Sequence, residues 1–144
     1  MAAWKTDFEA QQTLHTILIL SDEPETAAIW ETLFQQRDCV IVKEATLPDA
    51  IQSARLIVPS LTLIDMRLSQ TERTILCKEF RKAGSGPILM LVSADTVQQV
   101  IEAKQAGADE CLVKPVNPAV LVVKAMAWVA NQYKEVAAPV QLFA

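Results

Sequence analysis

The sequence predicts an α/β fold in which helices cover both faces of a parallel sheet. Five short apolar runs, rich in Ile, Leu and Val, have the length of buried strands and are too short to cross a membrane. A stretch with helical spacing follows each run, and this repeated order of strand and helix is typical of parallel sheets. The chain has 144 residues, 51% of them hydrophobic and 21% charged, which suits one globular domain.

The predicted elements alternate from one end of the chain to the other. Strands are expected at 16–20, 39–42, 61–64, 87–92 and 111–113. Helices are expected at about 24–36, 47–57, 71–83, 95–106 and 117–132. We therefore expect one domain over residues 15–133, an N-terminal extension over 1–14, and a C-terminal tail or the start of a linker over 134–144.

Residues beside the predicted helices support these boundaries. Ser21 or Asp22 is expected to cap the first helix ahead of Pro24, because their side chains accept from free N–H groups. Asn117 stands in the same position ahead of Pro118. Left-handed helix ends are expected at three glycines, Gly84, Gly86 and Gly107.

Composition excludes several kinds of site. The net charge of −4 and the pI of about 5.0 do not suit a nucleic-acid surface, which needs clustered Lys and Arg. The N-terminus lacks the apolar stretch of a signal peptide, so we expect a cytoplasmic protein that binds no membrane. Cys39, Cys77 and Cys111 lack metal or redox spacing and are expected to be buried thiols. The only histidine, His15, is expected to precede the first strand, and Trp30 to pack in the core.

Polar residues gather where the predicted strands end. They are Ser21, Asp22 and Glu23 after the first strand, Asp65 after the third, Ser93 after the fourth and Lys114 after the fifth. Ligands bind at this edge of an open parallel sheet, so we expect these acids, the hydroxyl and the ammonium group to converge.

Such a group suits phosphoryl transfer. Asp65 closes an apolar strand, and Mg²⁺ relieves its repulsion with Asp22 through oxygen ligands. A carboxylate can attack phosphorus when the phosphoryl charge is neutralised, here by the metal and Lys114. The Ser93 hydroxyl would donate to a phosphoryl oxygen and pull its loop inward. The structural alternatives are a helix-capping Asp65, an exposed loop Lys114 and an ordinary strand-end Ser93.

Four segments resemble the response-regulator receiver family of two-component signalling. They are ILILSDEP at 17–24, LTLIDMRL at 61–68, MLVSA at 90–94 and GADECLVKP at 107–115. The resemblance extends from about residue 16 to 132 and implies a flavodoxin-like (βα)5 doubly wound parallel sheet with the strand order 2-1-3-4-5. It also implies phosphorylation by a sensor histidine kinase and no enzyme activity beyond Mg-dependent self-phosphorylation and slow self-dephosphorylation.

The resemblance implies roles for particular residues. Asp65 corresponds to the phosphoacceptor, Ser93 to the switch hydroxyl and Lys114 to the phosphate-binding lysine. Asp22, Asp65 and the backbone carbonyl of Arg67 correspond to the Mg²⁺ ligands. The peptide bond between Lys114 and the following proline is expected to be cis, which X-Pro bonds allow at modest cost.

Several positions depart from the family pattern. Ser21 replaces the first of two consecutive acids, so we expect weaker Mg²⁺ binding, with Glu23 as a further candidate ligand. The loop at 69–73 lacks the usual Pro and Gly, so it differs in shape or the third helix starts earlier. Cys111 replaces the switch aromatic, and the coupling from site to surface is therefore weaker or uses other side chains.

Arg67 and Asp95 stand where family members tune the lifetime of the acyl phosphate. We expect these two side chains to pair across the site and to screen it from water. An Arg67→Ala variant with an unchanged dephosphorylation rate would exclude that role.

The last predicted helix is apolar on two faces. The inward face is Leu121, Val122, Ala125, Trp128 and Val129, and the outward face is Val120, Val123, Met126, Ala127 and Ala130. Receivers often dimerise through the fourth helix, fifth strand and fifth helix, with Asp109, Glu110 and Lys124 as the polar rim here. A homodimer or an output domain absent from this chain can cover the outward face, and a fragment and a stand-alone protein stay equally open.

Three functions remain open at this point. The leading one is a phosphorylated receiver that switches a protein-interaction surface. The second is a degenerate pseudo-receiver, which acts as a phosphorylation-independent interaction or dimerisation module. The third is a different flavodoxin-like enzyme or cofactor carrier, although the chain has no glycine-rich phosphate loop.

Overall fold

The computed structural model describes residues 14–93 and 97–142. Five parallel strands form one sheet in the order β2-β1-β3-β4-β5, which confirms the predicted flavodoxin-like, doubly wound arrangement. The strands are β1 (His15–Ser21), β2 (Cys39–Glu44), β3 (Leu61–Asp65), β4 (Ile88–Val92) and β5 (Glu110–Val113). The helices are α2 (Pro24–Gln35), α3 (Leu47–Ile57), α4 (Gln70–Lys82), α5 (Val97–Ala106) and α6 (Pro118–Leu142).

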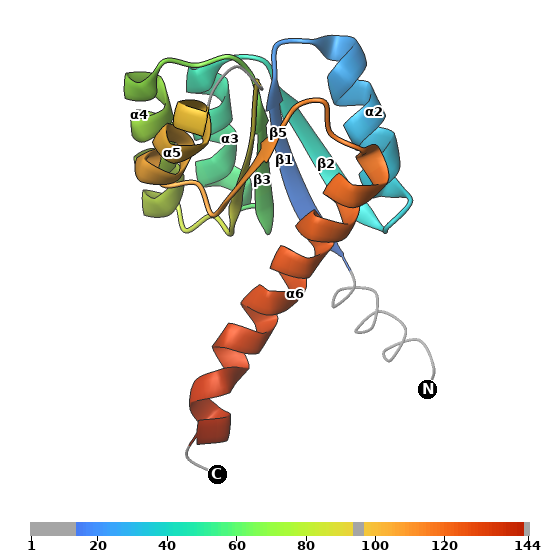
Figure 1. Cartoon of the computed structure of the whole chain (residues 1–144). Coiled ribbons are helices and arrows are strands. Elements are labelled where there is room, and N and C mark those ends of the chain that lie inside the picture. The colour runs from blue at the N-terminus through green and yellow to red at the C-terminus, as the bar shows by residue number, and fades with distance from the viewer. Residues whose placement is uncertain (1–13, 94–96, 143–144) are drawn as a thin grey trace.

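Helices cover both faces of the sheet, with α3, α4 and α5 on one side and α2 and α6 on the other (Figure 1). Leu18 and Leu20 of β1 pack with the first group, and Ile17 and Ile19 pack with the second. Side chains of a strand alternate between faces, so the apolar run of β1 contributes to both cores. All residues of β3 and β4 are buried in the same way.

The register of the sheet brings the ends of its central strands level. Ser21 at the end of β1 lies opposite Asp65 at the end of β3, and Val92 of β4 lies opposite Val113 of β5. Lys114 continues this ladder, because its backbone N–H donates to the carbonyl of Val92 at 2.8 Å. The residues that follow these strands therefore meet at one edge of the sheet.

The start of α2 differs from the prediction, since neither Ser21 nor Asp22 caps it. Glu23 is the N-cap residue and makes no side-chain capping bond. The Ser21 hydroxyl instead accepts from the N–H of Glu23 at 3.2 Å, ahead of the helix. Ser21 is still paired within β1, so it lies too early to reach the first turn of α2.

The starts of α4 and α6 follow the sequence reasoning. The third predicted helix begins at Gln70, one residue early, and Ser69 and Glu72 form a reciprocal capping box with bonds of 3.2 and 2.9 Å. This start replaces the family's Pro- and Gly-containing loop. Asn117 caps α6 by accepting from two N–H groups of its first turn, at 2.9 and 3.3 Å.

The prediction for the glycines is right at two positions and wrong at one. Gly84 (φ 78) and Gly107 (φ 126) adopt the left-handed conformation, but Gly86 does not. The chain is already turning into β4 at Gly86, whose N–H donates to the carbonyl of Pro59 at 3.0 Å. Val58 ends α3 in left-handed geometry (φ 44), which no glycine-based signal could reveal.

The first strand and the last helix extend further than predicted. His15 lies within β1, where it pairs with Cys39, and not ahead of the strand. The last helix continues to Leu142 and not to about 132, because residues 131–138 (NQYKEVAA) contain no Gly or Pro and are mostly good helix formers. The proposed domain boundaries stay a prediction, and residues 1–13 lie outside the described part of the chain.

The two faces of α6 agree with the sequence except at one residue. Buried or half-buried on the inward side are Leu121, Val122, Ala125, Trp128 and Val129. Exposed on the outward side are Val120, Val123, Ala127 and Ala130. Met126 was expected outside but is half-buried, because its sulfur lies 3.9 Å from Cys39 Sγ at the start of β2.

The polar residues around β5 divide into two groups. Lys124 Nζ lies 3.4 Å from Glu110 Oε1, at the rim that the sequence predicts. Asp109 instead bonds within the fold, because its Oδ2 accepts from the backbone N–H of Ile88 at 2.7 Å and from Arg81 at 2.6 Å. Asp109 therefore fixes the start of β4 beside β5.

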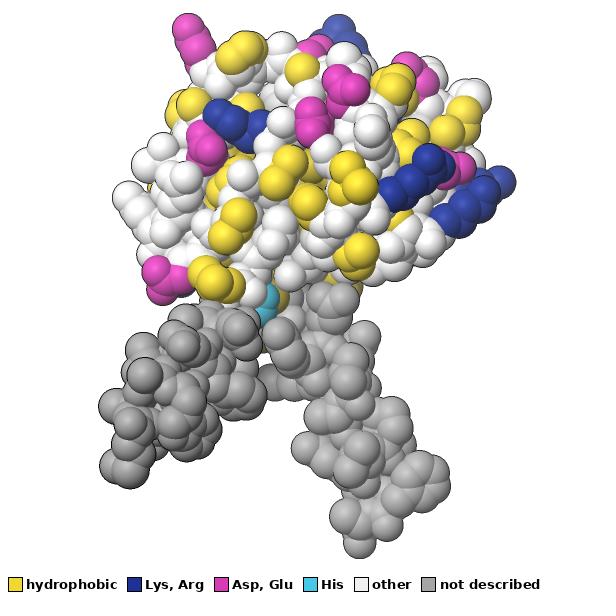
Figure 2. Space-filling view, turned by 180° about the vertical axis from the view of Figure 1, so that it is seen from behind, with side chains coloured by type: hydrophobic (Ala, Val, Ile, Leu, Met, Phe, Trp, Pro, Cys, Tyr) yellow, Lys and Arg dark blue, Asp and Glu magenta, His cyan; other side chains and the backbone are white. Residues whose placement is uncertain are grey.

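The surface carries mixed charge. On the face that Figure 2 shows, Lys and Arg lie among acidic and hydrophobic side chains and form no continuous basic surface. Within residues 14–93 and 97–142, no helix is long and apolar enough to cross a membrane.

Candidate functional site

Asp65 is the central residue of the polar edge. It ends β3 in the middle of the sheet and is only 3% exposed. A carboxylate in such a position costs free energy unless donors or cations surround it. The structure provides a cation for one oxygen of Asp65 and a hydrogen-bond donor for the other.

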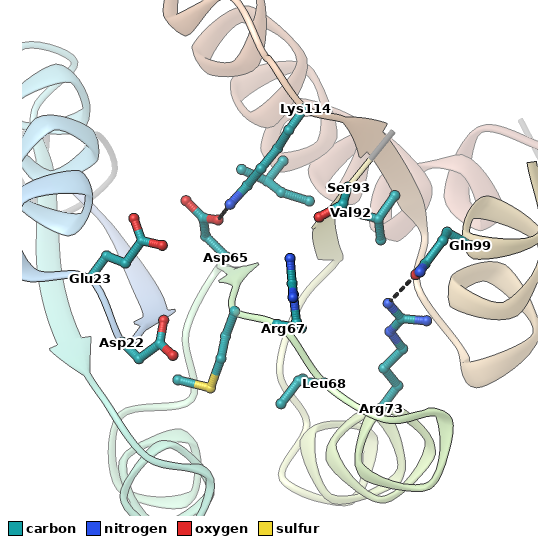
Figure 3. A pocket seen from close by; sticks show the side chains of 12 residues that line it. Asp22, Glu23, Asp65, Arg67, Leu68, Arg73, Val92, Ser93, Gln99 and Lys114 are labelled. Atoms are coloured by element: carbon teal, nitrogen blue, oxygen red, sulfur yellow. Dashed lines mark hydrogen bonds and ion pairs between the residues drawn. The ribbon is translucent and has the colours of Figure 1, made fainter. Parts of the chain in front are cut away.

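Lys114 and Trp30 hold the two oxygens of Asp65. The ammonium group of Lys114 forms an ion pair with Oδ1 (Figure 3). The indole N–H of Trp30 donates to Oδ2 at 2.9 Å. The Lys114 side chain is 40% exposed, so it joins the buried carboxylate to solvent. The peptide bond between Lys114 and Pro115 is cis, as the resemblance implied.

A cavity of about 460 Å³ opens beside Asp65 and contains most of the predicted site residues. Its acids are Asp22, Glu23 and Asp65, its cations are Arg67, Arg73 and Lys114, and Ser93 and Gln99 add neutral polar groups. The Arg67 side chain extends into the space between Asp65 and Ser93 (Figure 3). The cavity is therefore polar and carries both signs of charge.

The donor set of the cavity fits Mg²⁺. Among the described residues, no three His, Cys, Asp or Glu side chains form a metal cluster. Asp22 and Asp65 nevertheless line the same cavity, and the carboxylate of Glu23 accepts from Thr26 Oγ1 at 3.1 Å. Proteins usually hold Mg²⁺ by one or two carboxylates together with waters and phosphate oxygens. Asp22, Asp65 and the carbonyl of Arg67 suit that mode of binding and not an all-protein cage.

The hydroxyl side of the site is described only as far as Ser93. Ser93 follows β4 directly and lines the cavity together with Lys114. Asp95, which was expected to pair with Arg67, lies outside the described ranges 14–93 and 97–142, so that pairing stays a prediction.

Arg73 is a site residue that the sequence reasoning missed. It is only 7% exposed, and its Nη2 donates to Gln99 Oε1 of α5 at 2.8 Å. Its Nη1 lies 3.8 Å from Glu102 Oε2 on the same helix. The signal was present, because residues 73, 76, 77 and 80 follow the i, i+3, i+4, i+7 spacing of the buried face of α4.

Trp30 is a second residue whose role the sequence reasoning underestimated. The prediction that Trp30 packs in the core is right, since Trp30 is 6% exposed and belongs to the core formed with α6. A buried indole N–H nevertheless needs an acceptor, and here the acceptor is the central carboxylate. No local pattern could show this contact, which joins residues 35 positions apart.

The three cysteines differ in burial. Cys39 and Cys77 are buried as predicted, whereas Cys111 is half-buried because β5 is an edge strand. Burial raises the pKa of all three thiols above the usual 9.0. At Cys111 the charges of Arg73 and Lys104 partly offset this rise in pKa.

Comparison with protein families identifies the chain. Residues 17–126 match the family model described as the response regulator receiver domain. The chain belongs to this family. Receiver domains belong to two-component signalling, where sensor histidine kinases phosphorylate them, and they generally bind Mg²⁺ at the phosphorylation site and are not true enzymes.

Several curated regulators are similar to this receiver. The regulatory protein VanR of Enterococcus faecium is 29% identical over 119 residues, which are 83% of this chain and 51% of VanR. The transcriptional regulatory protein RstA of Escherichia coli is 27% identical over 77% of this chain and 46% of RstA. The chain thus spans about half the length of the curated relatives it matches.

Solved structures of receivers have the same fold. The BeF3-activated N-terminal receiver domain of Klebsiella pneumoniae RstA has a TM-score of 0.70 and 26% identity, over 79% of this chain and 97% of that one. A two-component response regulator from Clostridium difficile has a TM-score of 0.73 and 22% identity, over 82% and 98% of the two chains. The latter similarity concerns the fold alone.

Proposed function

We propose that this receiver accepts a phosphoryl group on Asp65 from a sensor histidine kinase and thereby switches a protein-interaction surface. The main support is the position of the Asp65 carboxylate, which is buried at the end of β3, ion-paired with Lys114, and open to a cavity with Asp22 and Ser93. A merely structural acid cap would not need a cavity of this size or two further cations in it.

The transfer can be written with the residues of the cavity. An oxygen of Asp65 attacks phosphorus, the P–N bond of the phosphohistidine breaks, and its electron pair stays on the imidazole nitrogen. Lys114 and the Ser93 hydroxyl neutralise or hydrogen-bond the phosphoryl oxygens as charge develops on them. Bound Mg²⁺, held by Asp22, Asp65 and the Arg67 carbonyl, would supply further charge neutralisation.

The path from the site to the surface is proposed to use Arg73 in place of an aromatic ring. Cys111 is too small to swing into the cavity, whereas the Arg73 guanidinium lines the cavity and bonds to Gln99 of α5. A phosphoryl group on Asp65 would add negative charge to the cavity that Arg73 also lines, and this charge would compete with Gln99 and Glu102 for the guanidinium. The surface that responds would be α5, β5 and α6.

The pseudo-receiver remains the second candidate, because Ser21 leaves one acid fewer than the family pattern. The third candidate, a cofactor-carrying relative, has no support from the family match. A cytoplasmic location, a homodimer and an output domain in a longer protein also belong to the proposal, the last because the curated relatives are about twice as long.

The first experiment is intact-mass analysis after incubation with acetyl phosphate and Mg²⁺, with Asp65→Asn as the matched control. The proposal expects one phosphoryl group on the wild type and none on the variant. Circular dichroism must show both proteins folded. If the folded wild type gains no phosphoryl group, either from acetyl phosphate or from a panel of histidine kinases, the pseudo-receiver replaces this proposal.

A further inference from the structure

The hydrogen bond from Trp30 to Asp65 adds a group to the site that a receiver does not need for its fold. The indole nitrogen lies 2.9 Å from Oδ2, and both residues are buried, with Trp30 only 6% exposed. The ring is held by the core between α2 and α6, so its N–H has a fixed direction. A smaller apolar ring such as phenylalanine would pack against the same core without a donor.

Two cavities meet at Asp65, and Trp30 lines only the second of them. The polar cavity lies toward α5, whereas a second, largely apolar cavity of about 500 Å³ is lined by Thr26, Trp30, Pro115 and Val116 beside Asp65 and Lys114. The indole N–H of Trp30 donates to Oδ2 of Asp65 from the α2 side. Oδ2 keeps the indole N–H, and attack on phosphorus would use Oδ1 once Lys114 moves from it to a phosphoryl oxygen.

We propose that Trp30 is a positioning residue of the phosphoacceptor, and that its N–H shortens the lifetime of phosphorylated Asp65. This inference rests on the proposed phosphorylation of Asp65. A hydrogen bond to a charged acceptor is stronger than one to a neutral acceptor. The N–H therefore stabilises the free carboxylate more than the neutral carbonyl of the acyl phosphate.

The direction of the effect follows from the charge changes. In hydrolysis, water attacks phosphorus, the bond between phosphorus and Oδ1 breaks, and its electron pair returns to Asp65, while the proton of the water leaves with phosphate or solvent. The regained negative charge is shared by both oxygens of Asp65. Trp30 donates to Oδ2 and therefore stabilises this charge as it develops. The same bond opposes phosphorylation, because the carboxylate loses charge in that direction.

Trp30→Phe tests this inference, because it retains an aromatic ring and removes the N–H. After removal of the phosphodonor, intact-mass analysis should show loss of the phosphoryl group about fivefold slower than in the wild type, from the difference between charged and neutral hydrogen bonds. Phosphorylation by acetyl phosphate should also be faster, by a smaller factor, because the two rates share the same hydrogen-bond difference. Trp128→Phe is the matched control, since Trp128 lies in the same core but contacts it from α6.

A spectroscopic measurement separates this effect from a loss of packing. The chain has three tryptophans, so its indole N–H resonances are few, and Trp4→Phe and Trp128→Phe identify the resonance of residue 30 by elimination. In the wild type this resonance should shift upfield on phosphorylation and also in Asp65→Asn, because the acceptor loses its charge. This observation requires no change at Trp30, so it stands even if Trp30→Phe fails to fold.

The outcomes distinguish the two proposals. If the wild type is phosphorylated but Trp30→Phe loses the group at the wild-type rate, the role of Trp30 is wrong and the receiver function stands. An indole resonance that does not move in Asp65→Asn would refute the hydrogen bond itself. A wild type that takes no phosphoryl group would overturn the proposed function, and the lifetime argument with it.

Discussion

Arg73 donates to Gln99 across 2.8 Å and so joins α4 to α5 beside the cavity of Asp65. A buried guanidinium costs free energy unless acceptors or anions surround it, and here its hydrogen-bond acceptor Gln99 and its ion-pair partner Glu102 both come from α5. The position of α5 is therefore tied to a cation that lines the cavity beside Asp65.

Arg73→Leu should leave phosphorylation of Asp65 possible but remove the response of α5. Hydrogen exchange over residues 97–106 is expected to change on phosphorylation in the wild type and to stay constant in the variant. Lys78→Leu, on the same helix but outside the cavity, is the control. An equal response of α5 in wild type and Arg73→Leu would contradict the coupling.

Lys114→Met should lower both phosphorylation and stability. The rate of phosphorylation should fall about a hundredfold, as for the loss of one preorganised donor. The free energy of unfolding should fall by about 1–3 kcal/mol, because the buried carboxylate of Asp65 loses the cation with which it is paired. The double variant with Asp65→Asn should regain most of this loss in urea denaturation, and a double variant no more stable than Lys114→Met would refute the explanation.

The Cys111 thiol should react slowly at neutral pH, since burial raises its pKa above 9.0. Alkylation of Cys111 by iodoacetamide at pH 8 should be slower in the folded than in the unfolded protein. Peptide mass mapping measures the extent of alkylation. Arg73→Leu should slow it further, because the lost positive charge leaves the pKa still higher. The raised pKa of the three thiols also means that the folded state favours their neutral form. Their contribution to the free energy of unfolding is therefore fully present below about pH 9 and is lost as the pH rises through their raised pKa values. Faster alkylation in Arg73→Leu would contradict the electrostatic contact.

Asp109→Ala should destabilise the fold by about 1–3 kcal/mol, because the N–H of Ile88 and the Arg81 guanidinium lose their shared acceptor. Glu110→Ala is the neighbouring control and should cost less than about 1 kcal/mol, since its pair with Lys124 is partly exposed. Urea denaturation of both variants gives the comparison. Equal losses at the two positions would show that Asp109 belongs to the rim.

Val123→Glu should reduce self-association if α5, β5 and α6 form a dimer contact. Val123 is 58% exposed on the outward face of α6, and Val120 lies beside it at 48%. Light scattering after size exclusion, with and without phosphodonor, should show a larger species for the wild type but not for Val123→Glu. Leu56→Glu, an exposed apolar residue on α3, serves as control. A wild type that is monomeric in both states would exclude this dimer.

The sequence predicts the sheet well, because the apolar runs of β1, β3 and β4 can only be buried strands. It also places Asp22, Asp65, Ser93 and Lys114 at one edge, since that follows from parallel topology alone. Trp30 and Arg73 could not be assigned in this way. Their polar groups find acceptors across helices that are distant in sequence, and only the packing of α2 and α5 decides those contacts.

Asp65 depends on both ends of the domain for its immediate surroundings. One oxygen is held by Trp30, 35 residues earlier in the chain, and the other by Lys114, which follows the last strand. A chain that is still emerging from the ribosome can have this aspartate without Lys114, and a chain with α2 detached has it without the indole of Trp30. If Asp65 is the phosphoacceptor, its phosphorylation would occur only on completed molecules, and a kinase would act only on receivers whose folding has finished.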